Sequence, residues 1–110
     1  MVTGVVKRGD VWMVALDPTV GSEIRKTRPC LIVSPDALNA HLRTCLGAPL
    51  TSGSHPARFR IPVRFQRKDG LILLDQLRTV DRARLVKRVG QIDAAVLAQT
   101  LATLRELFAE

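Results

Sequence analysis

The segment Arg58–Phe65 constrains the fold most strongly, because apolar and polar side chains alternate throughout it. Phe59, Ile61, Val63 and Phe65 fall on one face of an extended chain, and Arg58, Arg60, Pro62 and Arg64 fall on the other. This alternation predicts a half-buried strand with a cationic outer face. Proline has no N–H to donate, so Pro62 places the strand at a sheet edge. The arginines then either prevent pairing of that edge with another chain or form a surface that follows phosphates.

The rest of the chain continues the β pattern and ends in a helix. Further strands are predicted at Asp10–Leu16, Cys30–Ser34, Thr44–Leu50, Leu71–Gln76 and Arg84–Val89, with a helical turn at Ala37–His41 and a hairpin turn at Lys68–Gly70. An apolar stripe of Leu97, Leu101, Leu104 and Phe108 predicts a helix from Ala94 to Phe108, which Asp93 can cap. We therefore expect a single domain over residues 1–110, mainly β, folded as a small barrel with a C-terminal helix against it.

The charge balance is strongly basic. Seventeen Lys and Arg residues oppose ten Asp and Glu residues, which gives a net charge of +7. Such a field favours polyanions such as RNA or DNA, although an acidic protein partner or a merely solubilising surface would also account for it. The sequence contains no apolar run of about 18 residues and no N-terminal signal region, so we expect an intracellular protein without a membrane segment.

The cysteines and histidines give no sign of a metal centre. Cys30 and Cys45 lie within apolar segments, which predicts buried thiols. Neither has His or Cys neighbours at ligand spacing, so no metal and no cofactor is expected. His41 reads as a surface residue near a turn, whereas His55 lies in a loop from which it could reach a nearby site.

Three polar segments interrupt the apolar strands: Glu23–Arg28, Thr51–Ser52 and Asp75–Asp81. Strand ends on one side of a barrel can converge in space. Together these segments would supply carboxylates for proton abstraction, arginines for anion binding and hydroxyls for hydrogen bonds. The chain has no Gly-rich loop for a nucleotide phosphate and no nucleophile in an obvious activating setting. This inventory fits recognition of a phosphodiester, including metal-free cleavage of RNA.

RNA carries its own nucleophile, the 2′-hydroxyl. A protein that cleaves it need only remove the hydroxyl proton, stabilise a dianionic phosphorane and help the 5′-oxygen leave. Arginine suits the second task and a carboxylate the first. DNA lacks this hydroxyl, so the same site would cut RNA only.

Seven fragments of the chain resemble one known family in order and spacing. They are Arg8–Trp12, Leu16–Thr19, Gly21–Glu23, Thr27–Pro29, Ile32–Pro35, Pro49–Gly53 and Asp75–Asp81. The resemblance covers roughly residues 7 to 92, and the family is that of the MazF/PemK toxins of toxin–antitoxin systems. The resemblance implies an SH3-like barrel with a C-terminal helix, shared with CcdB-like proteins, and a homodimer. It also implies a cytoplasmic, metal-independent endoribonuclease that cuts single-stranded RNA at short sequences, leaving a 2′,3′-cyclic phosphate and a 5′-hydroxyl, and a cognate antitoxin that covers the RNA groove.

The resemblance also assigns residues by motif. Arg28 and Thr51 match the catalytic arginine and threonine of the family, Glu23 matches a loop carboxylate near the site, and Asp75 matches an aspartate that acts in the PemK-like branch. The RNA-binding candidates are Ser22, Lys26, Thr27, Ser52, His55, Arg58, Arg60, Gln76 and Arg78. Some PemK-like members carry His where Ser22 stands and Arg where Leu73 stands, which weakens a His-based proton relay here. The base is therefore Glu23 or Asp75, and the leaving-group acid is left open.

Structural and functional alternatives accompany these assignments. Arg28 could instead pair with Glu23, Thr51 could form a turn, and Asp75 and Asp81 could be caps or ion-pair partners of Arg78 and Arg82. The same scaffold could also serve a non-catalytic CcdB-like toxin that binds gyrase, or an RNA-binding module without cleavage.

Overall fold

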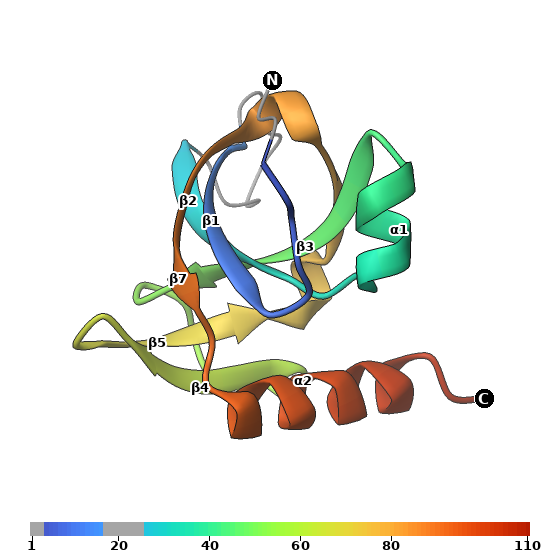
Figure 1. Ribbon diagram of the computed structural model, residues 1–110. Coiled ribbons are helices and arrows are strands. Elements are labelled where there is room, and N and C mark those ends of the chain that lie inside the picture. Colours follow the sequence, from blue (N-terminus) through green and yellow to red (C-terminus); the bar gives the residue numbers. More distant parts are fainter. Residues whose placement is uncertain (1–3, 17–25) are drawn as a thin grey trace.

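The computed structural model describes residues 4–16 and 26–110 (Figure 1). Within these ranges, seven strands are present: β1 Asp10–Ala15, β2 Thr27–Ile32, β3 Thr44–Thr51, β4 Arg60–Phe65, β5 Lys68–Leu73, β6 Arg78–Asp81 and β7 Leu85–Gln91. The helices are α1 Asp36–His41 and α2 Ala94–Leu107, and the 3₁₀ turns are η1 Leu74–Gln76 and η2 Arg82–Arg84.

All strand pairs are antiparallel and form one bent sheet. The strand order is β4-β5-β3-β2-β1-β7. β6 lies off this path and pairs with β3 at Thr44–Gly47, whereas β2 pairs with β3 at Gly47–Pro49. In the described part of the chain β4 and β7 do not pair, so the barrel stays open between these two end strands. The predicted class, mainly β with a C-terminal helix, is confirmed. β4 is also an edge strand, as Pro62 predicted, because it pairs only with β5.

The two faces of the central strands pack against two separate apolar clusters. Val11 and Leu31 belong to one cluster and their neighbours Trp12 and Cys30 to the other, as expected when side chains alternate along a strand. Three leucines of α2, Leu97, Leu101 and Leu104, pack on the first cluster, where the helix lies along the sheet below β4 (Figure 1). Phe108 does not complete this stripe, because α2 ends at Leu107 and the Phe108 side chain is exposed.

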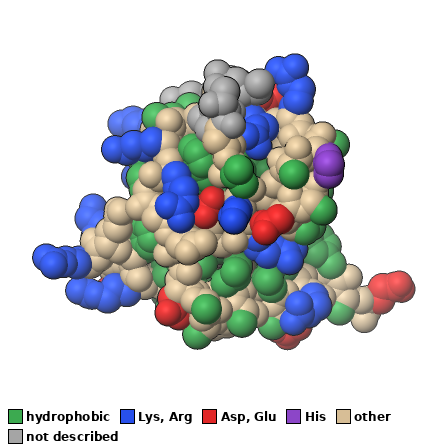
Figure 2. All heavy atoms as spheres, in the orientation of Figure 1, with side chains coloured by type: hydrophobic (Ala, Val, Ile, Leu, Met, Phe, Trp, Pro, Cys, Tyr) green, Lys and Arg blue, Asp and Glu red, His purple; other side chains and the backbone are tan. Residues whose placement is uncertain are grey.

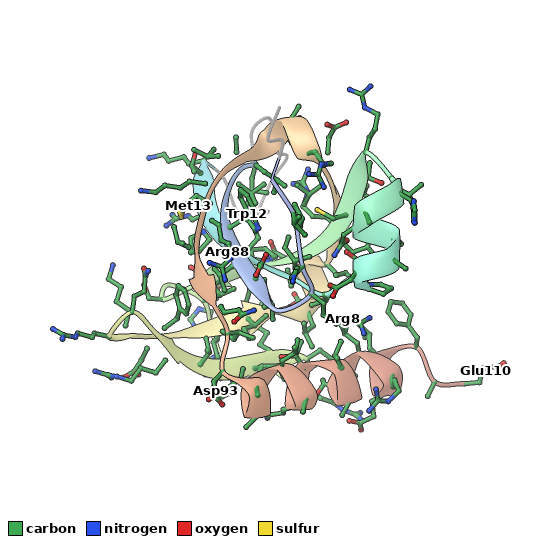
Figure 3. All side chains as sticks on the ribbon, viewed as in Figure 1. Arg8, Trp12, Met13, Arg88, Asp93 and Glu110 are labelled. Atoms are coloured by element: carbon green, nitrogen blue, oxygen red, sulfur yellow. The ribbon has the colours of Figure 1, made fainter. Side chains whose placement is uncertain are left out.

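The start of β1 is fixed by the buried carboxylate of Asp10. Its Oδ2 atom accepts a hydrogen bond from the backbone N–H of Lys7 at 3.0 Å, and its Oδ1 atom accepts one from Nε of Arg88 at 3.1 Å. Arg88 reaches Asp10 from β7, beside Trp12 of β1 (Figure 3). Gly9, directly before Asp10, has a positive φ of 93°, which side-chain-bearing residues rarely adopt. The fragment Arg8–Trp12 is therefore a structural corner, and Trp12 is buried in the core.

The predicted turn at Lys68–Gly70 is wrong. The hairpin turns at Gln66 and Arg67, whose φ angles are +51° and +66°, and Lys68–Gly70 form the first half of β5. Positive φ at both central residues gives a two-residue hairpin that matches the twist of the strands. Gly70 is needed for another reason: a Cβ there would lie 2.7 Å from the carbonyl oxygen of Thr51 on β3.

Other predictions also differ from the structure: the strands predicted at Cys30–Ser34 and Arg84–Val89 are β2 at Thr27–Ile32 and β7 at Leu85–Gln91. The strand predicted at Leu71–Gln76 ends at Leu73 and continues as the 3₁₀ turn η1. The sequence analysis also missed β6, which lies in the polar segment Asp75–Asp81 and pairs with β3. Only one residue of β6, Val80, is buried, so its apolar pattern is too short to be recognised without the partner strand.

Candidate active site

Arg28 and Thr51 lie at the ends of neighbouring strands. β2 and β3 pair antiparallel from Ile32 opposite Gly47 to Cys30 opposite Pro49, and Arg28 and Thr51 each lie two residues beyond this last pair. Both residues line one open cavity of about 360 Å³. The other polar side chains that line it are Ser52, Gln66, Lys68 and Asp69, and its apolar lining comes from Pro29, Leu50, Val63 and Phe65. Register alone thus brings together residues that are 23 positions apart in the sequence.

The side chain of Arg28 is free to bind an anion. It is exposed, and it makes no hydrogen bond or ion pair with another residue in the described ranges. The backbone carbonyl of Arg28 accepts a hydrogen bond from the thiol of Cys30 at 3.8 Å, and this bond does not involve the guanidinium. A guanidinium can therefore present its planar set of donors to a phosphate in this cavity.

Thr51 is held from two sides. Its Oγ1 atom accepts a hydrogen bond from the backbone N–H of Gly53 at 3.2 Å, so the predicted turn-forming role exists. Accepting this bond leaves the hydroxyl proton free for donation into the cavity. On the other side, Gly70 of β5 packs directly against the Thr51 carbonyl. The turn-forming role and a role in ligand binding are therefore compatible.

Asp75 is occupied by a different arginine from those expected. Nε and Nη2 of Arg60 donate to Oδ1 and Oδ2 of Asp75 at 3.0 and 2.9 Å, forming a two-pronged ion pair. The remaining Nη1 atom of Arg60 donates to the carbonyl of His55 at 3.0 Å. The Arg60 hydrogen bonds hold the pKa of Asp75 below its ordinary value and raise the pKa of Arg60. Asp75 does not line the cavity that contains Arg28 and Thr51.

Apart from Ser52, none of the predicted RNA-binding residues in the described ranges lines the cavity. Lys26 and Thr27 directly precede Arg28, and Lys26 has a positive φ of 66°. Arg58 lies over the ring of Phe59 and pairs with Glu106, while Gln76 and Arg78 are half-buried near β3. Glu23 and Ser22 lie outside the described residues. Of the predicted caps, Asp81 is one, since it accepts the backbone N–H of Ala83 at 2.8 Å.

Three polar side chains of the cavity, Gln66, Lys68 and Asp69, were not predicted from the sequence. All three belong to the β4–β5 hairpin, whose turn was placed too late in the chain. With the turn at Gln66–Arg67, β5 returns beside β3 with Leu71 opposite Thr51, and the residues before Leu71 line the cavity. The alternation of Arg58–Phe65, continued to its last apolar residue, was the signal that could have located them.

Both cysteines are buried free thiols, as predicted. Burial raises the pKa of Cys30 to about 12, opposed in part by the positive charge of Arg78, and burial also raises the pKa of Cys45. Neither thiol is thus a nucleophile near neutral pH. Over the described ranges, no three His, Cys, Asp or Glu side chains lie close enough together to hold a metal ion. None of the helices there has the length and apolar character that crossing a membrane requires.

Comparison with known proteins gives a consistent result. Residues 7–108 match the family described as PemK-like, MazF-like toxin of type II toxin-antitoxin system. Endoribonuclease PemK of Escherichia coli is 38% identical over 105 residues, covering 90% of this chain and 79% of the relative. Endoribonuclease EndoA of Bacillus subtilis is 36% identical over 95 residues, covering 81% of this chain and 82% of the relative.

Solved structures agree with the sequence relatives. The crystal structure of MazF from Deinococcus radiodurans has a TM-score of 0.83 and 27% identity, covering 94% of this chain and 96% of that one. A MazE–MazF structure from the same organism has a TM-score of 0.75 and 25% identity, with the same coverage. The small antiparallel barrel with a polar cavity at its strand ends is thus the scaffold of a toxin class. The chain belongs to the PemK-like, MazF-like toxins of type II toxin–antitoxin systems.

Proposed function

We propose that this protein is a toxin that acts as a metal-independent endoribonuclease on single-stranded RNA. The observation that carries the proposal is the shared cavity of Arg28 and Thr51, where, among the described residues, the guanidinium has no partner and the hydroxyl proton is free to donate to a ligand. The relatives named above are endoribonucleases, which supports the same reaction class. RNA brings its own 2′-hydroxyl nucleophile, so the reaction does not require a metal-activated water.

The proposed mechanism assigns one task to each group. Arg28 binds the scissile phosphate and stabilises the charge that develops on the phosphorane, and Thr51 donates to a non-bridging oxygen. A carboxylate, Glu23 or Asp75, removes the 2′-proton while the 2′-oxygen attacks phosphorus. The bond from phosphorus to the 5′-oxygen breaks, and that oxygen takes up a proton, which leaves a 2′,3′-cyclic phosphate and a 5′-hydroxyl.

Of the two carboxylates, Glu23 is the better candidate for the base. Both oxygens of Asp75 are bound by Arg60, and the pKa of Asp75 is lowered, so its affinity for a proton is weak. Asp75 is also absent from the cavity lining. We assign to Asp75 and Arg60 the task of holding the loop at His55, and to Glu23 that of taking the proton.

The assembly proposed for this chain follows its family. MazE–MazF structures contain toxin together with antitoxin, and we propose that a cognate antitoxin covers the cavity of a homodimer of this chain in the cytoplasm. A basic surface favours both an RNA substrate and an acidic segment of an antitoxin, because both are polyanions.

The deciding experiment is incubation of the purified protein with a long defined RNA in EDTA, followed by mapping of the new ends. We expect cuts at a short recurring sequence with cyclic phosphate and 5′-hydroxyl ends. A substrate with a single 2′-deoxy sugar at the cut site should resist cleavage, and full cleavage of it would exclude the mechanism. A gyrase supercoiling assay run in parallel distinguishes a ribonuclease from a gyrase-binding toxin. Inhibition of supercoiling by a protein that leaves the RNA uncut would favour the CcdB-like alternative.

A further inference from the structure

The β4–β5 hairpin contributes a second cation to the cavity. Lys68 at the start of β5 lines the cavity from one side, and Arg28 of β2 lines it from the other, with β3 between them. Neighbouring strands are roughly 4.8 Å apart, and Lys68 lies three residues beyond Leu71, the partner of Thr51, so the two backbones are separated by at least about 10 Å. Two cations that reach into one cavity from this separation suit two phosphates of one strand better than a single phosphate.

Of the hairpin side chains in the cavity, Lys68 is the one available for binding. Gln66 donates through Nε2 to the carbonyl of Val89 at 3.0 Å, and Asp69 accepts from Nη1 of Arg64 at 3.0 Å. Lys68 has no such partner in the described part of the chain. Its ammonium group therefore remains an uncompensated charge at the cavity rim.

The hairpin turn retains side chains where glycine would be less strained. Two-residue turns with positive φ at both positions usually carry Asn-Gly, whereas this turn carries Gln66 and Arg67. Such conformations persist where the surroundings determine them, and they are frequent at functional sites. Here the Gln66 amide bridges the open side of the barrel to β7, a contact that glycine could not make.

A second contact fixes the hairpin against β7. The ring of Phe65 lies so close to Gly90 that a Cβ on Gly90 would be 3.0 Å from it. Together with the Gln66 bond, this contact holds the start of β5 in place at the cavity. The rim position of Lys68 is therefore preorganised, which lowers the entropy lost when it binds a ligand.

The projecting end of the hairpin is cationic. Figure 2 shows Lys and Arg side chains gathered where the β4–β5 hairpin of Figure 1 extends from the body. Arg64, Arg67 and Lys68 are all exposed there, and Asp69 neutralises only Arg64. The positive electrostatic field at this rim attracts a polyanion towards the cavity.

We propose that the β4–β5 hairpin forms a second phosphate-binding subsite, in which Lys68 binds the phosphate next to the scissile one. This inference rests on the proposed ribonuclease function. Arg28 holds the scissile phosphate, and the apolar lining with the half-buried ring of Phe65 accommodates the nucleoside between the two phosphates. Lys68 contributes binding, while Arg28 contributes to the chemical step.

The test measures the salt dependence of binding to an uncleavable RNA oligonucleotide that has one 2′-deoxy sugar at the mapped cut site. Each neutralised phosphate of a single strand contributes about −0.7 to the slope of log K against log salt. Lys68→Gln should reduce the slope by about 0.7, so its affinity defect should be about 2.6-fold larger at 50 mM than at 200 mM salt. The matched control is Lys87→Gln, since Lys87 is an exposed lysine of β7 that does not line the cavity.

Shortening the oligonucleotide identifies which phosphate is bound. When the phosphate beside the scissile one is removed, wild type and Lys68→Gln should bind equally. In cleavage assays Lys68→Gln should raise KM several-fold and leave kcat within about 2-fold, since lost ground-state binding affects KM alone. Gln66→Gly relieves the strained turn but removes the bond to Val89, and it should lose the same part of the salt slope while remaining folded.

The outcomes separate this inference from the proposed function. If the protein neither binds nor cuts RNA, both fail. If it cuts RNA and Lys68→Gln has the slope of Lys87→Gln, the second subsite is excluded while the nuclease stands. A Gln66→Gly variant with the full wild-type slope would exclude the anchoring of the hairpin as the source of the subsite.

Discussion

Arg60 binds both carboxylate oxygens of Asp75 and, through its third nitrogen, the carbonyl of His55. The contacts are 3.0, 2.9 and 3.0 Å long. One guanidinium thus connects the edge strand β4, the turn η1 and the loop that follows Thr51 and Ser52. Each of the three guanidinium nitrogens of Arg60 donates a hydrogen bond to a protein oxygen. We therefore expect Arg60 to hold these segments together and other cations to bind the phosphates.

The pH dependence of Asp75→Asn distinguishes a loop-holding role from a catalytic one. If Glu23 is the base, the acid limb of the kcat/KM profile should survive in Asp75→Asn, with a lower plateau. If Asp75 were the base, that limb would disappear with nearly all of the activity. Arg60→Gln is the matched variant, and it should lower activity to a similar degree because it breaks the same ion pair.

The same ion pair predicts the direction of a stability change. The pKa of Asp75 is lower in the folded than in the unfolded protein, so the pair stabilises the fold above the ordinary pKa of 3.8. This contribution is lost as the pH falls through the lowered pKa. Chemical unfolding of wild type and Asp75→Asn at pH 7 and at acidic pH should therefore show a difference that shrinks on acidification. A difference that grew would contradict the ion pair.

Arg28→Ala should abolish most of the activity and keep the fold. Loss of one group that stabilises transition-state charge lowers kcat by roughly 10²- to 10³-fold. Arg28→Lys should restore only part of this, since an ammonium lacks the planar fork of donors. Arg43→Ala is the control, because Arg43 lies between α1 and β3 and does not line the cavity. An Arg28→Ala variant with near-normal kcat would remove the central residue from the mechanism.

Substitutions at Thr51 test the hydroxyl on its own. Thr51→Val keeps the shape and loses a neutral donor, which is worth about 1 kcal/mol and so roughly 5- to 10-fold in rate. Thr51→Ser keeps the hydroxyl and should retain most of the rate. Single-turnover cleavage of a short RNA substrate measures both. A large loss in Thr51→Ser with little loss in Thr51→Val would indicate that packing of the methyl group, and not the hydroxyl, is required.

Gly70→Ala should displace Thr51 from β5. The added Cβ would lie 2.7 Å from the Thr51 carbonyl oxygen and 3.2 Å from its carbonyl carbon, distances that only backbone movement can relieve. We expect a loss of about 1–3 kcal/mol in the free energy of unfolding, together with reduced kcat. Gly4→Ala is the control, since nothing lies within 4 Å of the Cβ it would add. Unchanged stability of Gly70→Ala would mean that the close approach of the strands is not rigid.

Alkaline pH should destabilise the protein through Cys30. Its pKa rises from 9.0 to about 12 on folding, so the folded state binds the thiol proton more tightly. The stabilisation is complete below pH 9 and declines above it, by up to about 1.4 kcal/mol per pH unit. Between pH 8 and 11, the free energy of unfolding should fall more steeply with pH for wild type than for Cys30→Ala. Thiol reagents should likewise modify the native protein only at the rate at which it opens, and rapid labelling at neutral pH would contradict the burial.

The sequence alone determined those features that depend on local pattern. Alternation in Arg58–Phe65 predicted a half-buried strand, because successive side chains of a strand face opposite sides of the sheet, and Pro62 placed that strand at an edge. The spacing of Leu97, Leu101 and Leu104, with Asp93 before them, located the helix and its cap. Arg28 and Thr51 were identified as a pair by the motifs that contain them, and the resemblance carried by those motifs also gave the family.

Tertiary structure decided what depends on contacts between distant segments. The pairing of β2 with β3 brought Arg28 and Thr51 to one cavity, and a two-residue turn of two non-glycine residues placed Lys68 in it. Asp75 pairs with Arg60 rather than with Arg78, because β4 and η1 lie side by side. Strand pairing, turn conformation and ion-pair choice are set by the summed packing of the whole chain, which no local stretch of residues contains.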